Sequence, residues 1–323
     1  MKSTMNEIDA TSAIMELMKQ VLIIGSNSTD MGEVEMMARY REFFDVGASE
    51  VTFTGLHFDQ LGIILSESEF SIIDTVHNKE LNEYDLIAFR GKVRLNVEMA
   101  YCVSRYALIH NVTFFNDYSP YGSFSKVVQS VAFFELGVPF IKTLYSTRTS
   151  EFHKLITKHL STPFIVKDSY GSHGADNYLL ENLPALRQLN LSTDKRYVAQ
   201  DYFENKCDYR ILCIGNEELI IRRTAKGSTH LNNTSMGATA DLVEGQFLPP
   251  IAIKQAHKIA DTLKMGIAGV DLLYNEKTGV YKFLEINSQP QLTSGAFVPQ
   301  KQQLLHRYLR KKLSISSDKD SKP

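Results

Sequence analysis

Two apolar segments near the C-terminus constrain the fold most, because together they have the pattern of one β-hairpin. GIAGVDLLY (266–274) and VYKFLEIN (280–287) are rich in β-branched and aromatic residues, as strands are. The NEKTG run between them consists mainly of residues that favour turns. A chain with this pattern has at least one antiparallel sheet.

The second of these strands carries polar residues as well as apolar ones. Side chains alternate between the two faces of a strand, so every second residue shares a face. On this rule one face carries Tyr281, Phe283, Glu285 and Asn287.

The length of the hairpin loop decides whether a third polar residue joins that face. A five-residue loop over 275–279 would pair Asp271 with Phe283, one diagonal step from Glu285 and on the same face. A three-residue loop keeps this parity, whereas a two- or four-residue loop would turn Asp271 to the opposite face.

Two carboxylates and an amide oxygen on one face can serve as a site for Mg²⁺, which prefers oxygen ligands. The alternative is an ordinary solvated sheet face, where Asp, Glu and Asn are common. The hairpin alone does not decide between the two interpretations.

Composition limits the class of protein. A length of 323 residues suggests two domains or three small ones, and 43% hydrophobic residues are enough to form a core. The net charge of -2 gives no support to nucleic-acid or membrane-surface binding. Three cysteines without CxxC spacing argue against a disulfide scaffold or a zinc site. With no signal-peptide pattern and no long apolar run, a cytoplasmic protein without a membrane contact is expected.

The chain changes character near residue 123. After an N-terminal extension (1–19), strand-like and helix-like segments alternate over 20–122, which predicts an α/β domain with an open sheet. Its first loop, GSNSTDMG, lacks the GxGxxG pattern and is interpreted as a structural turn. Mostly antiparallel strands then follow, in a central part (123–195) and a C-terminal part (196–313). The polar tail (314–323) is expected to be disordered.

Four basic residues are candidates for contact with phosphate. Lys167 ends a strand and precedes GSHG, where glycine-rich backbone can approach phosphate oxygens, although a surface hairpin turn is the commoner explanation. Lys126 lies in the first turn of a helix, a position where a surface lysine is ordinary. Arg222 and Arg223 are adjacent on a strand, so only one of them can face a given site.

Several segments taken together resemble the ATP-grasp superfamily, in particular its RimK-like branch of ribosomal-protein glutamate ligases. They cover about 123–295 and are, in order, SFSKVVQSVAFFELGVPFIKT, PFIVKDSYGSHG, YVAQDYF, DYRILCIGNEELIIRRTA, HLNNTSMGATA and AGVDLLYNEKTGVYKFLEINSQP. The resemblance implies an α/β N-terminal domain followed by an α+β ATP-grasp fold, in which ATP lies between two antiparallel sheets.

The resemblance also implies roles for individual residues. The positions expected near ATP are Lys126 and Lys167 at the phosphates or adenine edge, Asp201 and Tyr202 at the adenine or ribose, Asp208 near the ribose, and Asn233 in the substrate-side loop. The positions expected to bind Mg²⁺ (or Mn²⁺) are Asp271, Glu285 and Asn287. Arg210 and Arg222 are the candidate catalytic arginines, and sequence alone does not choose between them.

Three departures from the family pattern involve four positions. Asp168 follows Lys167 where proline is common, and Met236 and Ala238 replace arginine and glycine of the glutamate-ligase branch. Gln291 replaces a glycine after the metal motif. The last two departures leave open whether glutamate is the group transferred.

The implied function is an ATP-dependent carboxylate–amine ligase that acts through an acyl phosphate on an amino acid, peptide or protein. A ligase that crosslinks the side chains of a precursor peptide would use the same residues, and a non-catalytic ATP-binding regulatory protein is a further alternative. The expected partners are a substrate with a carboxylate and an amine acceptor, without nucleic acid or membrane, and the resemblance allows a homo-oligomer.

Overall fold

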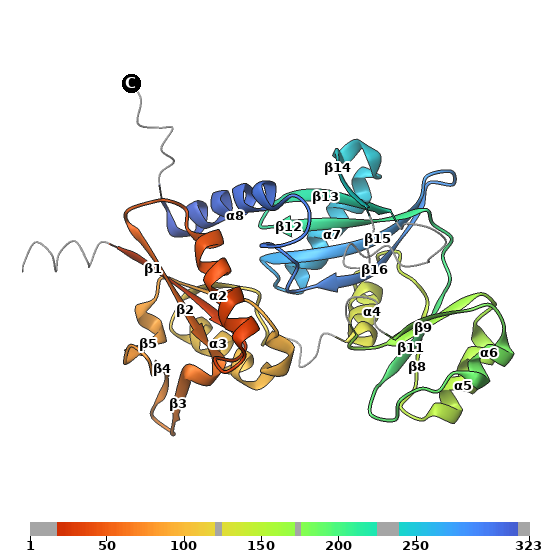
Figure 1. Ribbon diagram of the computed structural model, residues 1–323, viewed down its shortest axis with the longest axis horizontal. Coiled ribbons are helices and arrows are strands. Elements are labelled where there is room, and N and C mark those ends of the chain that lie inside the picture. Colours follow the sequence, from red (N-terminus) through yellow and green to blue (C-terminus); the bar gives the residue numbers. More distant parts are fainter. Residues whose placement is uncertain (1–17, 120–124, 172–175, 225–238, 316–323) are drawn as a thin grey trace, which may run out of the picture. The chain divides into compact units, whose positions relative to one another are not determined.

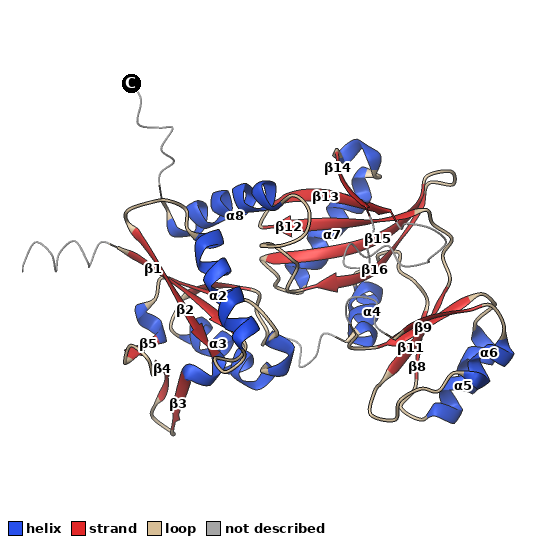
Figure 2. Ribbon diagram, viewed as in Figure 1, coloured by secondary structure: helices blue, strands red, loops and turns tan. Residues whose placement is uncertain are grey.

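The computed structural model describes residues 18–119, 125–171, 176–224 and 239–315. The chain forms two compact units, drawn in Figure 1 and coloured by secondary structure in Figure 2. The first unit comprises residues up to 122 together with 291–294 and 298–323, and the second comprises 123–290 and 295–297. Most of the N-terminal extension and of the polar tail lies outside the described residues.

The first unit is built around a four-stranded parallel sheet. From edge to edge its strands are β2 (Val51–His57), β1 (Lys19–Gly25), β6 (Leu86–Phe89) and β7 (Thr113–Phe115). Its main helices are α2 (Met31–Phe44) and α3 (Val97–Ile109). Residues 21–24 of β1 are completely buried, as in a parallel strand covered on both faces. The side chain of Asp30 caps α2 by accepting hydrogen bonds from the N–H groups of Gly32 and Glu33.

A small antiparallel sheet and a returning helix complete the first unit. The sheet contains β3 (Leu61–Leu65), β4 (Phe70–Asp74) and β5 (Lys79–Glu80), and the 3₁₀ turns are η1 (Phe58–Gln60), η2 (Leu81–Glu83) and η3 (Val93–Leu95). Helix α8 (Val298–Leu313) packs on α2: His306 Nε2 donates to the carbonyl oxygen of Phe43 at 2.9 Å, and Arg310 donates to that of Val46 at 2.7 Å. Helix α8, the last described helix, therefore belongs to the same unit as the first strands.

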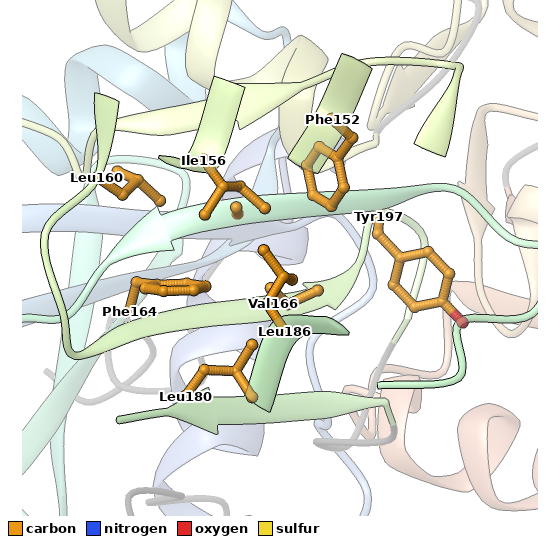
Figure 3. Close-up of a cluster of buried hydrophobic side chains, with 9 residues drawn as sticks. Phe152, Ile156, Leu160, Phe164, Val166, Leu180, Leu186 and Tyr197 are labelled. Carbon is orange, nitrogen blue, oxygen red and sulfur yellow. The ribbon is translucent and has the colours of Figure 1, made fainter. Parts of the chain in front are cut away.

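The second unit begins with a four-stranded antiparallel sheet. Its strands, in spatial order, are β10 (Asn177–Leu180), β9 (Phe164–Asp168), β11 (Tyr197–Asp201) and β8 (Thr143–Tyr145). Helices α5 (Thr149–His159) and α6 (Leu183–Gln188) cover one face, and Figure 3 shows the core beneath them. Phe152 and Ile156 of α5 and Leu186 of α6 pack with Phe164 and Val166 of β9. Lys167, the next residue of β9, consequently points to the other face of the sheet.

A five-stranded antiparallel sheet forms the rest of the second unit. Its strands, in spatial order, are β14 (Thr239–Val243), β13 (Glu217–Thr224), β12 (Cys207–Ile214), β15 (Ile267–Asn275) and β16 (Val280–Asn287). Helix α7 (Pro250–Thr262) follows the 3₁₀ turn η5 (Gly245–Phe247) and packs on one face against β12 and β15. β12 and β13 join through a tight turn in which Gly215 has a φ of 57°, a value that favours glycine.

Helix α4 (Lys126–Glu135) and the segment after it lie against β16. The N–H of Ile141 donates to the carbonyl oxygen of Phe283 at 3.2 Å, and the N–H of Phe283 donates to that of Pro139 at 2.9 Å. The start of the central part is thereby fixed to the C-terminal sheet. The order of an α/β unit followed by two antiparallel sheets agrees with the fold class expected from the sequence. Across the described segments, no helix combines the length and apolar character needed to cross a bilayer.

Candidate active site

The hairpin of β15 and β16 brings Asp271 directly opposite Glu285, by a route that differs from the predicted one. Asn275 pairs with Val280, so the loop contains four residues, and with regular pairing Asp271 would face away. A β-bulge shifts the register between Leu272 and Asp271 and restores the shared face.

The same bulge corrects the predicted distribution of side chains along β16. Phe283 pairs with Leu272 and is completely buried, whereas Glu285 pairs with Asp271. Because adjacent residues of β15 face opposite sides, Phe283 and Glu285 also face opposite sides. Tyr281 lies with Phe283, so only Glu285 and Asn287 of the four residues expected together share the polar face.

The three candidate metal ligands are neighbours on this face. Asn287 pairs with Gly269, two residues before Asp271, and the Asn287 Nδ2 atom donates to Glu285 Oε1 at 3.4 Å. The Glu285 side chain is 25% exposed and the Asp271 residue only 2%. The face therefore presents one accessible carboxylate beside one buried carboxylate.

Two arginines hold the buried carboxylate of Asp271. Arg210, its partner across β12 and β15, donates from Nε to Oδ1 and from Nη2 to Oδ2, both at 2.8 Å. Arg223 Nη2 lies 3.1 Å from Oδ2. Burial alone would raise the pKa of the Asp271 carboxyl, but the charges and hydrogen bonds of Arg210 and Arg223 outweigh burial and lower that pKa to about 2. Asp271 is therefore ionised at neutral pH.

Asp208 extends this network on the next strand pair. Asp208 and Arg223 pair across β12 and β13, and Arg223 Nε donates to Asp208 Oδ1 at 2.5 Å. Burial raises the pKa of the Asp208 carboxyl to about 7, against the charge of Arg223, and the neighbouring Asp271 carboxylate adds to the rise. Asp208, placed near the ribose by the resemblance, is thus largely enclosed by protein.

Arg222 lies on the other face of β13. It pairs with Tyr209 rather than with Asp208, and its Nη2 atom contacts Asp241 Oδ2 at 3.2 Å in a partly exposed ion pair. The structure brings Arg210 to the Asp271 cluster and leaves Arg222 outside it. Arg223 takes the place beside Asp271 instead, because alternation along the strand gives this face to only one of the two.

Two lysines from the central part complete the charged cluster. Lys167 on β9 is 6% exposed, and desolvation by burial lowers the pKa of its ammonium to about 8 even though Glu285 opposes the shift. Lys126, the first residue of α4, donates from Nζ to the carbonyl oxygen of Gly171 at 2.6 Å and lies 3.8 Å from Glu285 Oε2. Both lysines predicted to contact phosphate therefore lie near the Glu285 carboxylate.

Hydrogen bonds attach helix α4 both to the residues after β9 and to β16. Ser125 caps it by accepting from the N–H of Val128, and the N–H of Lys126 donates to the carbonyl oxygen of Ser169 at 3.0 Å. One turn further on, Gln129 Oε1 accepts from the N–H of Ile286 at 2.9 Å, between Glu285 and Asn287 in sequence. We did not predict a role for Gln129. Its spacing of three residues from Lys126 puts both on one helix face and is the signal that could have identified it.

Two further predicted residues, Asp201 and Tyr202, lie at the end of β11 and directly after it. Asp201 is the last residue of β11, where its N–H donates to the carbonyl oxygen of Lys142 at 3.2 Å, and Tyr202 follows it. Both are half-buried, and their roles stay predictions. Asn233 lies outside the described residues, as do Met236 and Ala238.

The side chains on the polar face suit a divalent cation that prefers oxygen. The candidate ligands are two carboxylates and one amide. Among the described residues, no group of three or more His, Cys, Asp or Glu side chains is placed to hold a metal ion. The arginines occupy one acceptor position on Asp271 Oδ1 and two on Oδ2, which leaves a lone pair of Oδ1 available. Asp271, Glu285 and Asn287 would hold Mg²⁺ through such oxygens.

Comparison with curated proteins gives partial matches. A probable alpha-L-glutamate ligase of Cellvibrio japonicus is 27% identical over 167 residues, which is 49% of this chain and 52% of the relative. The uncharacterized MG012 homolog of Mycoplasma pneumoniae is 25% identical over 154 residues, 47% of this chain and 52% of the relative. The chain spans about half the length of the curated relatives it matches.

Comparison with solved structures shows a shared fold over most of the chain. A RiPP-associated ATP-grasp ligase of Chryseobacterium gregarium, in complex with ADP and a leader and core peptide, has a TM-score of 0.65 at 13% identity and covers 93% of this chain and 98% of its own. The D-alanine–D-alanine ligase of Bacillus anthracis, in complex with ATP, has a TM-score of 0.63 at 14% identity and covers 92% of this chain and 98% of its own. The expected α+β ATP-grasp fold is confirmed.

The family model of the RimK-like ATP-grasp domain matches residues 127–298, which is more than half of the chain and includes every residue of the charged cluster except Lys126, one position before the match begins. The chain belongs to the RimK-like ATP-grasp family.

Proposed function

We infer that this chain is an ATP-dependent ligase that joins a carboxylate to an amine through an acyl phosphate. The observation that supports this proposal is the meeting of Asp271, Glu285 and Asn287 with the buried lysines Lys126 and Lys167. Oxygen ligands suited to Mg²⁺ lie next to cations suited to phosphate. Membership in the RimK-like family and the fold shared with ATP-grasp ligases agree with the proposal.

The proposed reaction has two steps. A carboxylate oxygen of the substrate attacks the γ-phosphorus of ATP, the bond to the β,γ-bridging oxygen breaks, and ADP leaves. An amine then attacks the carbonyl carbon of the acyl phosphate, loses a proton and displaces inorganic phosphate, which leaves an amide. A bound Mg²⁺ would supply charge neutralisation at the phosphate oxygens.

The charged side chains of the protein would have two roles in this reaction, phosphate binding and positioning of a metal ligand. Lys126 and Lys167 would bind phosphate oxygens and offset the negative charge of the transferred group. Arg210 and Arg223 keep Asp271 ionised and fixed in orientation, so they act on the metal ligand as positioning residues. Direct catalytic contact by Arg210 or Arg222 stays a prediction, as does contact of Asp201 and Tyr202 with the adenine or ribose.

Phosphate release tests the proposal. The wild-type protein with ATP, Mg²⁺ and a pool of amino acids and short peptides should release phosphate in a substrate-dependent manner. Glu285→Gln should lower the rate about 100-fold, because the substitution removes a charged ligand of the metal. Its melting temperature should change little, since Glu285 is a quarter exposed and its nearest cation lies at 3.8 Å.

Glu218→Gln is the matched control, because Glu218 lies in the same sheet and contacts His257 Nε2 of α7 at 2.8 Å, outside the charged cluster. It should retain wild-type activity. If the protein binds ADP but releases no phosphate from ATP with any pool of amino acids and peptides, the hypothesis of a non-catalytic, regulatory ATP-binding protein is supported instead. Mass spectrometry of the product separates the two ligase hypotheses: joining an amine adds its mass less one water, whereas crosslinking within one peptide only loses water.

A further inference from the structure

A pocket of about 390 Å³ lies between α5 and α6, away from the charged cluster. Leu183 and Leu186 of α6 form its apolar lining, and Leu186 belongs to the core shown in Figure 3. These helices cover the face of the central sheet to which Val166 points, whereas Lys167 points to the opposite face. The sheet therefore separates this pocket from the lysine proposed to bind phosphate.

The polar lining of the pocket is basic. His153, Lys154 and Lys158 of α5 and Arg187 of α6 line it, and no acidic side chain does. Lys154 forms an ion pair with Glu151 at 2.9 Å. Within the described part of the chain, neither Lys158 nor Arg187 has a salt-bridge partner.

Helix-end electrostatics explains only part of this pattern. Lys158 and Arg187 each lie in the last turn of their helix, where a cation is favoured by the helix dipole. That preference accounts for each cation separately. It does not account for their convergence with His153 and Lys154 around one apolar lining.

His153 supplies an independent observation. Its Nε2 atom is shielded from solvent and has no hydrogen-bond partner among the residues that the structure describes. A buried nitrogen without a partner costs stability, and a rotation of the His153 ring that brings this nitrogen to a ligand atom in the pocket would recover the cost.

We propose that the α5–α6 pocket is a second ligand site, for a small organic anion that carries carboxylate or phosphate groups on an apolar frame. The frame would lie against Leu183 and Leu186, and the anionic groups would meet Lys158 and Arg187. The guanidinium of Arg187 matches both carboxylate and phosphate, because both accept paired hydrogen bonds. The volume falls within the range of small-molecule sites, about 300–1,000 Å³.

Isothermal titration with two anionic probes tests this site, with Mg²⁺ and ADP present in saturating amounts to fill the nucleotide site. Phthalate carries two carboxylates on an aromatic frame, phenylphosphate carries one phosphate, and benzyl alcohol is the neutral control. At least one anionic probe should bind the wild-type protein, and benzyl alcohol should not. Binding of phthalate alone assigns the site to carboxylates, binding of phenylphosphate alone assigns it to phosphates, and binding of both assigns it to either group.

Charge reversal locates the binding. Lys158→Glu and Arg187→Glu should each raise the dissociation constant of the bound probe about tenfold or more, as expected for loss of a charged hydrogen bond. His153→Phe keeps an aromatic ring at this position and removes both ring nitrogens, and should raise the dissociation constant of the probe about threefold to tenfold. Lys254→Glu makes the same change of charge at an exposed position of α7 outside the pocket, and should leave the dissociation constant unchanged.

If charge reversal lowers the melting temperature, Lys158→Gln and Arg187→Gln give the same comparison with a smaller change of charge. The proposal is overturned if neither anion binds, if benzyl alcohol binds equally well, or if Lys254→Glu weakens binding as much as the pocket variants. Because no turnover is measured, these outcomes are independent of whether the chain is a ligase.

Discussion

At the scale of single residues, burial and strand parity decide which charges act together. Asp271, Asp208 and Arg223 are each more than nine-tenths buried, and Arg210 joins them from the edge of the cluster. The two arginines balance the two carboxylates, but Asp271 contacts both arginines through three N–H groups, whereas Asp208 is bonded to Arg223. This inequality explains why the pKa of Asp271 falls while that of Asp208 rises.

Neighbouring arginines should differ sharply in their effect on stability. Arg223→Ala removes the partner of Asp208 and one partner of Asp271, and leaving buried charges unpaired should cost about 3–5 kcal/mol of unfolding free energy. Arg222→Ala breaks one partly exposed ion pair and should cost less than about 1 kcal/mol. Urea unfolding followed by circular dichroism measures both. Equal losses would contradict the assignment of faces on β13.

Loss of the positive charge on Lys167 should lower the proposed ligase activity at basic pH. A lysine is charged only below its pKa, and a pKa of about 8 in place of the ordinary 10.5 means that the positive charge is lost as the pH rises through 8. The kcat/KM for ATP, which reports the free enzyme, should therefore fall above pH 8. In Lys167→Arg, whose guanidinium stays charged, that fall should be absent up to pH 9.5. A wild-type profile that is flat from pH 7 to pH 9.5 would remove Lys167 from phosphate binding.

At the scale of elements, the sequence predicts the strands better than it predicts their register. The hairpin of 266–287 and the shared face of Asp271 and Glu285 were expected from alternation, whereas the direct pairing of Asp271 with Glu285 in place of Phe283 was not. The four-residue loop and the compensating bulge were not, because an extra residue in one strand leaves no signal in a period-two pattern. The choice of Arg223 over Arg222 depends on the same register. The β3–β5 sheet was also missed, since its strands are short and one of them has only two residues.

Gln129 should act as a positioning residue that holds α4 to β16, the strand that carries Glu285 and Asn287. Gln129→Ala leaves the N–H of Ile286 without its acceptor and frees Glu285 and Lys126 to move relative to one another. We expect about a tenfold loss in kcat/KM for ATP, comparable to loss of a residue that orients a metal ligand, with an increased Mg²⁺ requirement. Val131→Ala, on the exposed side of the same helix, is the control and should retain activity. A lower melting temperature with an unchanged Mg²⁺ requirement would reduce Gln129 to a structural role.

At the scale of the whole molecule, the chain combines an α/β unit with a second unit that carries all the candidate metal ligands. The fold class could be predicted because six short segments match one family in order and spacing. The division of the C-terminus could not, since 298–313 was grouped by sequence position with the ATP-grasp part, whereas α8 packs in the first unit through His306 and Arg310. Contacts between residues more than 250 positions apart leave no local pattern.

A crystal structure of the protein with Mg²⁺ and a non-hydrolysable ATP analogue tests the central claim most directly. We expect one ion bound by an oxygen atom from each of Asp271, Glu285 and Asn287, with Lys126 and Lys167 contacting the phosphates of the same nucleotide. An ion held elsewhere, while Asp271 remains bound only by Arg210 and Arg223, would contradict the account.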